Sequence, residues 1–494
     1  MDADVVVVGA GPVGMTLAAE LALAGVRAIV VEALPERSKL SRAGGVHPRT
    51  AEMLDQRGLL GPLLATGDYQ EYDGAHLAGL TISYTSWNSR EPGRFIPQTQ
   101  VEAFLERQLA GRVPIRRGHR LVGVEQTADG VVATVSDGER ESTLRALYLV
   151  GADGAHSSVR KLLGIDFPGR AGTDTAVVGD VRVTGPRAGD IYHEPPGQVV
   201  RSEDGRWAVR FPLGDGLQRL VIGGTGAQVS RTEPVTADEV RDGLAAVYGG
   251  DVELVDLPYV TRIADAARQV RDYRLGRVFL AGDAAHVHLP LGGQGMNVGI
   301  QDAFNLGWKL AAAVLGRVPD GLLDTYSSER HPVAARVIRN TRAQSVLTDW
   351  AGTGNPDLPE LRSFVADLFA LPDATHFIGG MISGLDVHYD MPDQPEHPLL
   401  GYRLPNPDLK TADGTVRPYE LLRSGGGLLI DFSGDSVHLS AEVPYVRAYG
   451  DLGADVLLVR PDGHVCATTT DGLPAGLSRW FGTATGADWR ISAT

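Results

Sequence analysis

Three glycines near the start of the chain have the spacing of a phosphate-binding turn. The motif at residues 9–14, GAGPVG, follows the apolar run 5–8 and precedes a stretch, 15–23, that favours a helix. At such a turn the first glycine allows a tight bend, the second lets backbone approach a pyrophosphate, and the third allows close helix packing. The helix N-terminus then faces the phosphate charge. The residues of this predicted turn are Gly9, Gly11, Pro12 and Gly14.

Two carboxylates extend this prediction to a larger nucleotide. Glu32 ends the next apolar run, 28–31, where a carboxylate can accept hydrogen bonds from ribose hydroxyls. Much later in the chain, Asp283 follows Gly282 at the end of the apolar run 278–281. The two glycine-bearing segments together fit the two ends of a single bound FAD.

The composition limits the class of protein. The chain has 494 residues, of which 43% are hydrophobic, so it is long enough for two or three domains with a large core. Its formal net charge of −15 argues against a nucleic-acid partner, because binding to a phosphate backbone needs a concentrated basic surface. The single cysteine, Cys466, excludes an intramolecular disulfide, a CxxC redox pair and a cysteine-based zinc site.

The histidines and the first residues of the chain limit the class of protein further. None of the thirteen histidines belongs to an HExxH motif or another paired-ligand spacing, so no metal site is expected. Asp2 and Asp4 stand where a signal peptide would be basic. We find no apolar stretch of about 18 residues that could cross a bilayer. We therefore expect a soluble, cytoplasmic protein with no membrane partner, either a monomer or a homodimer.

The pattern of elements predicts an α/β protein with three domains. We expect a discontinuous nucleotide-binding domain of residues 1–174 and 264–390. Residues 175–263 carry short alternating strands, which favours a separate inserted sheet. The proline-rich segment 391–398 marks the start of a third domain, 391–494. Helices are predicted at 48–55, 101–109, 297–315 and 327–347, and strands at 427–432 and 454–460, with three more between 121 and 149. Residues 67–97, around 77–84, are predicted to form a strand-containing excursion from the nucleotide-binding domain.

Three segments, taken in order, resemble a known family. They are residues 9–14, then 151–160 (GADGAHSSVR), then 276–286 (GRVFLAGDAAH). Their order is similar to that of the single-component, class A FAD-dependent monooxygenases, and the resemblance covers most of residues 1–345. Further strings resemble the phenol-hydroxylase-like branch, above all the aromatic polyketide hydroxylases of tetracycline, angucycline and anthracycline pathways. These strings include HPRT at 47–50, DQRGL at 55–59, LDTY at 323–326, ERHP at 329–332 and HPLLG at 397–401.

The resemblance implies a fold and a role for several residues. It implies a Rossmann-like FAD domain, a substrate-binding β-sheet domain at 175–263 and a thioredoxin-like C-terminal domain, which Cys466 alone would leave without redox activity. Asp153 lies in the segment that serves FAD and NAD(P)H, and Asp283 in the segment that holds the ribityl chain. The family positions that contact the pyrophosphate, the ribityl region and adenine match Arg42, Gln98 and Leu121-Val122 respectively.

The segment 290–297, PLGGQGMN, is expected to face the flavin ring. Its glycines, Gly292, Gly293 and Gly295, offer backbone without side chains to a flat ring. Amides of Met296 and Asn297 at a helix N-terminus could stabilise negative charge at the flavin N1/C2 oxygen. By the resemblance, the carbonyl of Pro290 faces the peroxide site. We therefore assign Pro290, Gly292 and Gly293 to the catalytic face.

The activity implied is oxygenation of an aromatic ring. NAD(P)H, as NADPH or NADH, would reduce a non-covalent FAD, and O2 would then give a flavin C4a-hydroperoxide that hydroxylates a polycyclic aromatic polyketide. Baeyer-Villiger insertion and antibiotic-inactivating hydroxylation remain open on the same scaffold, as does, more remotely, a flavin-binding protein without oxygenase activity. No general base is identified; by region alone, the pocket candidates are His47, Tyr72, Tyr84, His193 and Arg210.

Two structural alternatives compete with these roles. Asp153 and Arg160 could form an ion pair between domains. His286 could be a structural hydrogen-bonding residue instead of a base, and this alternative is favoured.

Overall fold

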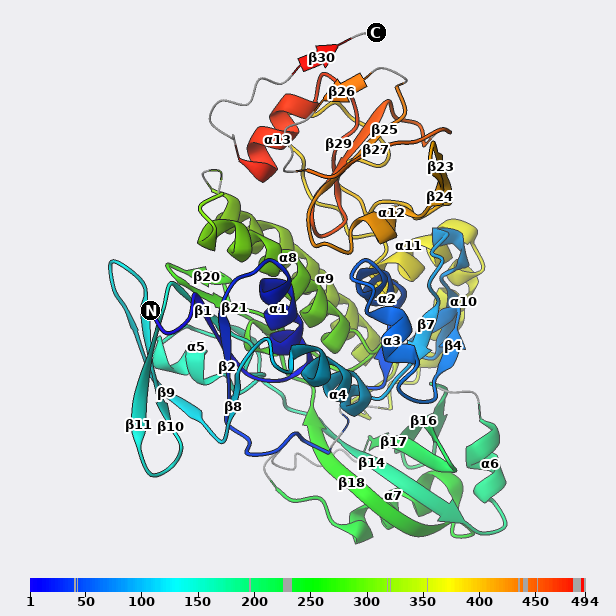
Figure 1. Cartoon of the computed structure of the whole chain (residues 1–494). Coiled ribbons are helices and arrows are strands. Elements are labelled where there is room, and N and C mark those ends of the chain that lie inside the picture. Colours follow the sequence, from blue (N-terminus) through cyan, green and yellow to red (C-terminus); the bar gives the residue numbers. More distant parts are fainter. Residues whose placement is uncertain are drawn as a thin grey trace.

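The fold was analysed in a computed structural model of the chain (Figure 1). The structure describes residues 1–494 apart from the following: Leu40, Arg42, 195–196, 225–232, Val318, Asp320, Thr353, 434–435, 439–442, Asp451, 483–489 and 493–494.

A six-stranded sheet forms the centre of the N-terminal region. Its order is β20-β21-β12-β1-β2-β8, and neighbours run parallel except for the edge pair β20 and β21. The strands are β1 (Val5–Val8), β2 (Ala28–Glu32), β8 (Ile115–Arg117), β12 (Tyr148–Gly151), β20 (Arg274–Leu275) and β21 (Val278–Leu280). All four residues of β1 are buried, as expected for a central parallel strand covered on both faces.

The register of this sheet brings the three motifs together. Val8 at the end of β1 pairs with Gly151 at the end of β12, and Gly151 pairs in turn with Leu280 at the end of β21. The segments that follow these strands, starting at Gly9, Ala152 and Ala281, therefore leave the same edge of the sheet side by side. Ligands of open α/β sheets bind at this carboxyl edge.

Helices cover the sheet and carry the site. α1 (Pro12–Leu23) follows β1 and packs on α8 (Gly295–Val314) and on α4 (Gln98–Leu109). α9 (Thr325–Leu347) runs beside α8 and continues through Pro332. The shorter helices of this region are α2 (Pro48–Asp55), α3 (Leu60–Leu64) and α5 (Ser158–Leu162). The predicted helix at 48–55 is confirmed, and those at 101–109, 297–315 and 327–347 are confirmed within three residues.

Smaller sheets decorate this region. The three strands predicted between 121 and 149 form a meander of β9 (Arg120–Gln126), β10 (Val131–Ser136) and β11 (Glu141–Ala146). Short strands make two further small sheets: β3 (Gly45–Val46), β4 (Gln70–Tyr72) and β7 (Gly93–Phe95), and β13 (Gly169–Arg170), β19 (Ala267–Gln269) and β22 (His286–Val287).

The strand-containing excursion expected around 77–84 is present as a hairpin. It consists of β5 (Gly74–Leu77) and β6 (Leu80–Ser83), with Ala78 and Gly79 at the turn. Both turn residues have positive φ, +53° and +85°, so the chain cannot remain extended there.

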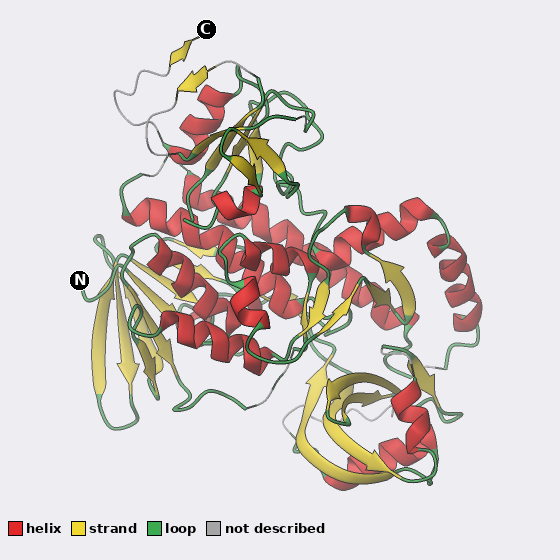
Figure 2. Cartoon of the chain, turned by 45° about the vertical axis from the view of Figure 1, so that its right-hand side comes forward, coloured by secondary structure: helices red, strands yellow, loops and turns green. Residues whose placement is uncertain are grey.

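The inserted sheet is antiparallel and lies below the first sheet in Figure 1. Its order is β15-β16-β17-β14-β18. The strands are β14 (Thr175–Thr184), β15 (Val199–Arg201), β16 (Trp207–Gly214), β17 (Leu217–Gly223) and β18 (Glu253–Ala264). Side chains of α6 (Ala188–His193) and α7 (Ala237–Tyr248) pack with one face of the sheet, through residues such as Ile191, Leu220 and Leu244. Figure 2 shows this sheet curving around those helices.

The C-terminal sheet has thioredoxin-like topology. Its order is β27-β25-β28-β29; β25 and β27 are parallel, and β28 is antiparallel to both neighbours. The strands are β25 (Leu428–Asp431), β27 (Tyr445–Arg447), β28 (Val456–Val459) and β29 (Val465–Ala467), followed by α13 (Leu473–Phe481). Cys466 is buried in β29. Around them lie β23 (Leu409–Thr411), β24 (Gly414–Val416), α12 (Pro418–Leu421), β26 (Ser436–His438) and β30 (Arg490–Ser492).

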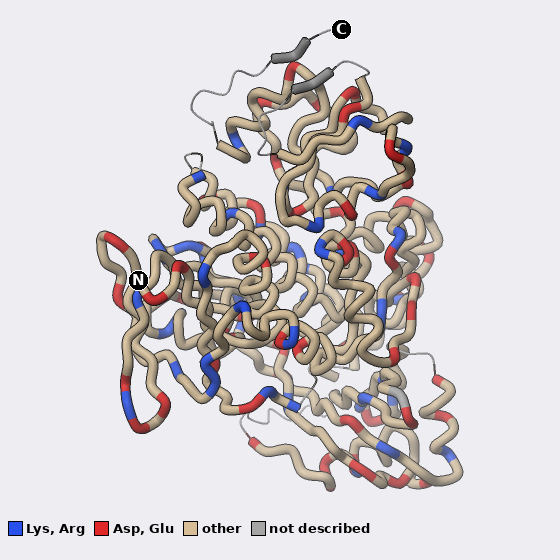
Figure 3. The backbone as a smooth tube through the Cα atoms, viewed as in Figure 1, with Lys and Arg blue, Asp and Glu red and all other residues tan. Residues whose placement is uncertain are grey.

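Two of the helices that were not predicted from the sequence lie between α9 and the C-terminal sheet. They are α10 (Leu358–Phe369) and α11 (Pro372–Ser383). Among the described parts of the chain, no helix has the length and apolar character needed to cross a membrane. Figure 3 shows acidic and basic residues interleaved along the chain in all three regions.

Candidate active site

The glycine turn after β1 has one open position and two closed ones. Gly9 has a φ of +108°, and a Cβ on it would lie 2.3 Å from the carbonyl oxygen of Ala152. A Cβ on Gly14 would lie 2.0 Å from the carbonyl oxygen of Gly9. Gly11, by contrast, has no atom of the described residues within 4 Å of its Cβ position. The fold therefore requires Gly9 and Gly14, whereas Gly11 leaves room for a group at the N-terminus of α1, which begins at Pro12.

Glu32 lies beside this turn. Its Oε2 accepts a hydrogen bond of 2.7 Å from the amide of Ala10, and its Oε1 accepts one of 2.8 Å from the amide of Leu34. The backbone thus fixes the carboxylate at the ends of β1 and β2. Each carboxylate oxygen still has a second lone pair with which to accept a hydroxyl.

Asp153 has a buried oxygen that accepts no hydrogen bond from the residues that the structure describes. Its Oδ2 accepts hydrogen bonds from the amides of Ser158 and Val159, at 2.6 and 3.2 Å. Among the described residues, its Oδ1 has no hydrogen-bond partner, and burial raises the pKa of the carboxyl group. An unpaired buried acceptor is costly, so Asp153 is suited to accept a hydrogen bond from a bound molecule.

Arg160 does not pair with Asp153 in the described structure. Its guanidinium donates to the carbonyl oxygens of Ala284 and Ala155, each at 2.8 Å, and lies over the ring of Phe167. The alternative in which the two residues serve only as an ion pair is therefore not what the structure shows.

Asp283 follows β21 in the short helical turn Gly282–Ala284, and its side chain is exposed. Gly282, with a φ of +58°, donates its amide to Asp302 Oδ2 at 3.1 Å. The same oxygen is bonded to His286 Nε2 at 2.8 Å. His286 is buried and held by this carboxylate, which confirms its structural role.

The loop that precedes α8 is shaped by glycines. Gly292 and Gly293 have φ values of +79° and +64°, and the amide of Gly293 donates to the carbonyl of Pro290 at 3.2 Å. α8 begins at Gly295, so the amides of Met296 and Asn297 lie in its first turn, where they lack intrahelical partners. An anion could be stabilised at this helix N-terminus, and the role of the two amides toward the flavin stays a prediction.

The Asn297 side chain has a further role that the sequence did not reveal. Its Oδ1 accepts the amide of His47 at 2.8 Å, while its Nδ2 donates to the carbonyls of Gly45 and Gly293, each at 3.0 Å. Asn297 thereby ties the glycine loop to the segment between β3 and α2.

The remaining predicted cofactor residues are less informative. Gln98 begins α4; its Oε1 accepts the amide of Ala43 at 3.1 Å and its Nε2 donates to Glu102 at 2.7 Å. Val122 lies on β9 and is 36% exposed. Arg42 lies outside the described residues. The site roles assigned to all these residues remain predictions.

An apolar cluster joins the inserted sheet to the glycine loop. Trp207 of β16 packs on Trp350, which follows α9, with ring centroids 4.7 Å apart, and its Nε1 donates to the Trp350 carbonyl. The cluster consists of Ala176, Trp207, Leu289 and Trp350, with Val199, Val209, Val221, Ile263 and Leu291 packed against them. Leu289 and Leu291 flank Pro290, so the inner face of the sheet lies directly against the loop.

Among the base candidates, only His47 is brought to the loop. Its Nδ1 must donate to the carbonyl of Ile382, 2.9 Å away, which leaves Nε2 as the acceptor of the neutral ring. That Nε2 is 3.4 Å from the Cβ position of Gly293. Burial lowers the pKa of His47 to about 4, so the ring is neutral at pH 7.

The other candidates lie elsewhere or have different partners. Tyr72 and Tyr84 are neighbours, with ring centroids 6.4 Å apart, and burial raises the pKa of each. Arg210 is buried and donates to Gln218 on the inserted sheet. His193 is exposed at the end of α6.

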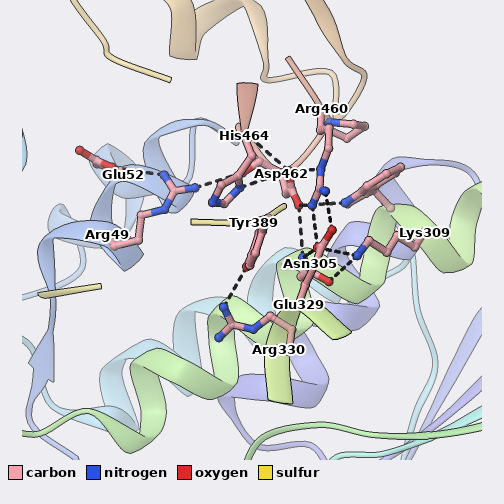
Figure 4. Close-up of polar contacts among 12 residues, drawn as sticks. Arg49, Glu52, Asn305, Lys309, Glu329, Arg330, Tyr389, Arg460, Asp462 and His464 are labelled. Atoms are coloured by element: carbon pink, nitrogen blue, oxygen red, sulfur yellow. Dashed lines mark hydrogen bonds and ion pairs between the residues drawn. The ribbon is translucent and has the colours of Figure 1, made fainter. Parts of the chain in front are cut away.

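A buried group of charges was missed altogether (Figure 4). The ionised side chains are fully or almost fully buried, and Glu329 accepts from both Lys309 and Arg460. The members are Asp302, Lys309, Glu329, Arg330, Arg460 and Asp462. A signal for it existed, because Asp302 and Lys309 stand in a helix whose other residues are mostly apolar and buried, and a buried charge needs a partner.

Two protein-family profiles match this chain. The family profile described as FAD binding domain matches residues 2–341, and the profile described as aromatic-ring hydroxylase, C-terminal, matches residues 397–484. Three features at neighbouring strand ends are compatible with a bound FAD. They are the open position at Gly11, the oxygen of Asp153 without a partner among the described residues, and the exposed side chain of Asp283.

Three proteins illustrate the similarity. The solved structure of OxyS anhydrotetracycline hydroxylase from Streptomyces rimosus superposes with a TM-score of 0.88, at 41% identity, covering 98% of this chain and 100% of that one. A rifampicin monooxygenase of Streptomyces venezuelae is 41% identical over 98% of this chain and 99% of its own. A dialkyldecalin synthase of Streptomyces rugosporus is 36% identical over 98% of this chain and 100% of its own. The chain thus belongs to the FAD-dependent aromatic-ring hydroxylases, and it is a monooxygenase of that family.

Proposed function

We propose that this monooxygenase hydroxylates a polycyclic aromatic polyketide, with NAD(P)H as reductant and O2 as the source of oxygen. The observation that carries the proposal is the apolar cluster of Trp207, Leu289 and Trp350, which sets the inner face of the inserted sheet against the loop of Pro290. A flat apolar substrate suits such a wall, because its affinity comes from buried area and a few polar contacts. The similarity to an anhydrotetracycline hydroxylase supports this substrate class.

The chain's own residues divide the work of cofactor binding. In this proposal Gly11 and the N-terminus of α1 receive the pyrophosphate, and Glu32 accepts ribose hydroxyls. Asp283 accepts from the ribityl chain, and the amides of Met296 and Asn297 face the flavin ring. Bound FAD supplies hydride acceptance and oxygen activation, which no side chain can provide.

The protein's part in the reaction is to exclude water and orient the substrate. The tryptophan pair and the two leucines beside Pro290 make an apolar wall that excludes water. This limits the release of reduced oxygen as H2O2 in place of product formation. His47, neutral and beside Gly293, is an acceptor for a hydroxyl proton at the same loop.

The domain boundaries follow the same division of labour. We propose a flavin domain of residues 1–174 and 264–390, a substrate domain of 175–263 and a C-terminal domain of 391–494. The sheets support these limits, since β14 begins at Thr175 and β18 ends at Ala264. A cytoplasmic location, as a monomer or a homodimer, is part of the same proposal.

Labelled oxygen tests the reaction. The enzyme is incubated with NADPH, ¹⁸O2 and a polycyclic phenol of the anhydrotetracycline type, and the label is located by fragmentation or NMR. A labelled aromatic hydroxyl is the expected result. A labelled ester oxygen would indicate Baeyer-Villiger insertion, and product without label would reject oxygenation of that substrate.

Two relatives favour specific alternatives. The similarity to a rifampicin monooxygenase supports hydroxylation that inactivates an antibiotic, which a growth assay with expressed enzyme would reveal. The similarity to a dialkyldecalin synthase supports a second alternative, a flavoprotein that does not oxygenate its substrate. That protein would bind FAD and show no substrate-stimulated oxidation of NADPH.

A further inference from the structure

One ion pair behind the site contacts both halves of the proposed flavin-binding surface. Arg330 Nε donates to Asp302 Oδ1 at 2.7 Å, and both side chains are fully buried. Asp302 Oδ2 holds the amide of Gly282, the residue before Asp283. Arg330 Nη2 donates to the carbonyl of Val298 in the first turns of α8, at 3.2 Å. The pair therefore connects the ribityl contact to the helix whose N-terminus faces the ring.

The charges of this pair are fixed. Burial alone would raise the pKa of Asp302, but the charge of Arg330 and the hydrogen bonds from Arg330 and His286 outweigh it and lower that pKa. The carboxylate is consequently ionised and acts only as an acceptor. Its two oxygens serve Gly282, His286 and Arg330, so displacement of Arg330 changes the hold on the turn that carries Asp283.

A single hydroxyl joins Arg330 to the C-terminal region. The remaining nitrogen, Nη1, donates to the hydroxyl of Tyr389 at 2.9 Å (Figure 4). Tyr389 is 2% exposed and stands in the segment that links α11 to the C-terminal sheet. Its ring packs on His464, with centroids 4.3 Å apart, and the guanidinium of Arg460 lies 5.2 Å from the ring centre.

A turn of the C-terminal sheet supplies the residues that pack on the Tyr389 ring. His464 and Arg460 belong to the turn between β28 and β29, and Asp462 at its centre holds both. Arg460 also pairs with Glu329, which precedes Arg330 on α9. The turn therefore fixes Arg330 from two sides, through the Tyr389 ring and through the neighbouring residue of its own helix.

We propose that Arg330 is a positioning residue for the flavin, and that the C-terminal domain sets its place through the hydroxyl of Tyr389. This inference rests on the proposed function, since it concerns the cofactor contacts made by Asp283 and α8. It gives a domain with one buried cysteine a role that requires no redox chemistry: the turn at 460–464 holds Tyr389, Tyr389 holds Arg330, and Arg330 with Asp302 holds the two flavin contacts.

The test compares two buried tyrosines. Tyr389→Phe removes the hydroxyl that accepts from Arg330. Tyr419→Phe removes an equally buried hydroxyl, which donates to the carbonyl of Leu404 at 2.9 Å within the C-terminal region. FAD is removed from each protein, and affinity for FAD is titrated by the quenching of flavin fluorescence, with the melting temperature of the apoprotein measured in parallel.

We expect both variants to lose similar stability but only Tyr389→Phe to bind FAD roughly 3- to 10-fold more weakly, as the loss of one hydrogen bond transmitted to the site allows. A double-mutant cycle with Arg330→Lys distinguishes an effect of Tyr389 on FAD affinity through Arg330 from a general loss of packing. Lysine keeps the charge but lacks the fork that reaches Tyr389 and Val298. In that background Tyr389→Phe should have no further effect on FAD affinity.

Two results would overturn the inference. Equal FAD affinities of Tyr389→Phe and Tyr419→Phe would show that the hydroxyl does not act on the site. Additive effects of Tyr389→Phe and Arg330→Lys would show that it acts by another route. Failure of the wild-type apoprotein to bind FAD would instead contradict the proposed function, and is therefore distinct from both.

Discussion

Arg460 and Glu329, 131 residues apart, form two hydrogen bonds of 2.6 and 2.9 Å at the buried junction between the C-terminal sheet and α9. Lys309 of α8 donates to the same carboxylate at 2.8 Å. Burial by itself would raise the pKa of Glu329, but the two cations outweigh it and lower the pKa to about 2. This carboxylate thus pairs with two buried cations, of which Arg460 is also paired with Asp462, and the stability of the junction depends on its charge.

Glu329→Gln should destabilise the protein by about 3–5 kcal/mol, because it removes the buried carboxylate that pairs with Lys309 and one of the two buried carboxylates that pair with Arg460. Urea denaturation followed by tryptophan fluorescence measures the change. Asp190→Asn is the matched control, since Asp190 pairs with Arg187 at the surface and is 56% exposed. The control should change stability by no more than about 0.5 kcal/mol. Equal effects of the two variants would show that the buried charge is unimportant.

Acid should weaken the same junction through His464. Burial lowers the pKa of His464 to about 4, below its ordinary value of 6.5. The unfolded chain therefore binds a proton between pH 6.5 and 4 that the folded chain does not, and stability falls as pH falls through this window, by up to about 1.4 kcal/mol per pH unit. Above pH 6.5 the ring is neutral in both states and contributes no slope.

The measurement is the difference in unfolding free energy between wild type and His464→Gln across that range. Other titrating groups, including His47, are common to both proteins and cancel. We expect the difference to change in favour of the variant as pH falls from 6.5 to 4. A difference that is independent of pH would mean that His464 is protonated in the folded protein.

The glycine turn offers a separation of folding from binding. Gly11→Ala should fold like the wild type, since no atom of the described part of the chain lies within 4 Å of the added Cβ, yet the methyl group would occupy the space proposed for the pyrophosphate. Gly14→Ala should fail to fold normally, because its Cβ would lie 2.0 Å from the Gly9 carbonyl oxygen. Melting temperature of the apoprotein and FAD titration together distinguish the two. Unaltered FAD affinity in Gly11→Ala would place the pyrophosphate elsewhere.

Local patterns account for the parts of the fold that the sequence predicted. The runs at 5–8, 28–32 and 278–280 are buried strands because their apolar residues are continuous, and the motif glycines stand where these strands end. α10 was not predicted although its apolar residues recur at helical spacing. What this spacing does not give is their burial, since Leu361, Phe364 and Leu368 are 43%, 60% and 41% exposed.

Pairings over long distances could not be read from one sequence. Asp302 and Lys309 signal buried charge, but nothing local identifies Arg330 or Arg460 as their partners. The same holds for His47, which reaches the loop only because Asn297 and Ile382 bind it from segments more than 200 residues away. These contacts depend on how the domains pack, which local propensity does not encode.

Asp283→Ala tests the ribityl contact. Its loss should leave one hydroxyl of a bound molecule unpaired at a cost of about 1–3 kcal/mol, so FAD affinity should fall roughly 5- to 150-fold. Asp272→Ala is the control, because it removes another exposed carboxylate shortly before β20. It should change the affinity for FAD by less than about twofold. An unchanged titration of Asp283→Ala would mean that the ribityl chain is held by a different residue.

The last prediction concerns the wall between the inserted sheet and the glycine loop. Trp350 is buried against Trp207, and replacing it by phenylalanine removes part of the indole from the cluster that shields Pro290. Water then has better access to the loop, so a larger share of the NADPH consumed should appear as H2O2 instead of product. FAD affinity should stay unchanged, because Trp350 has no place among the proposed cofactor contacts. Trp480→Phe, an equally buried tryptophan of the C-terminal region, is the control and should leave coupling as it is. If both variants divert the same share of NADPH to H2O2, the loss reflects general loosening, and the inserted sheet does not protect the reaction.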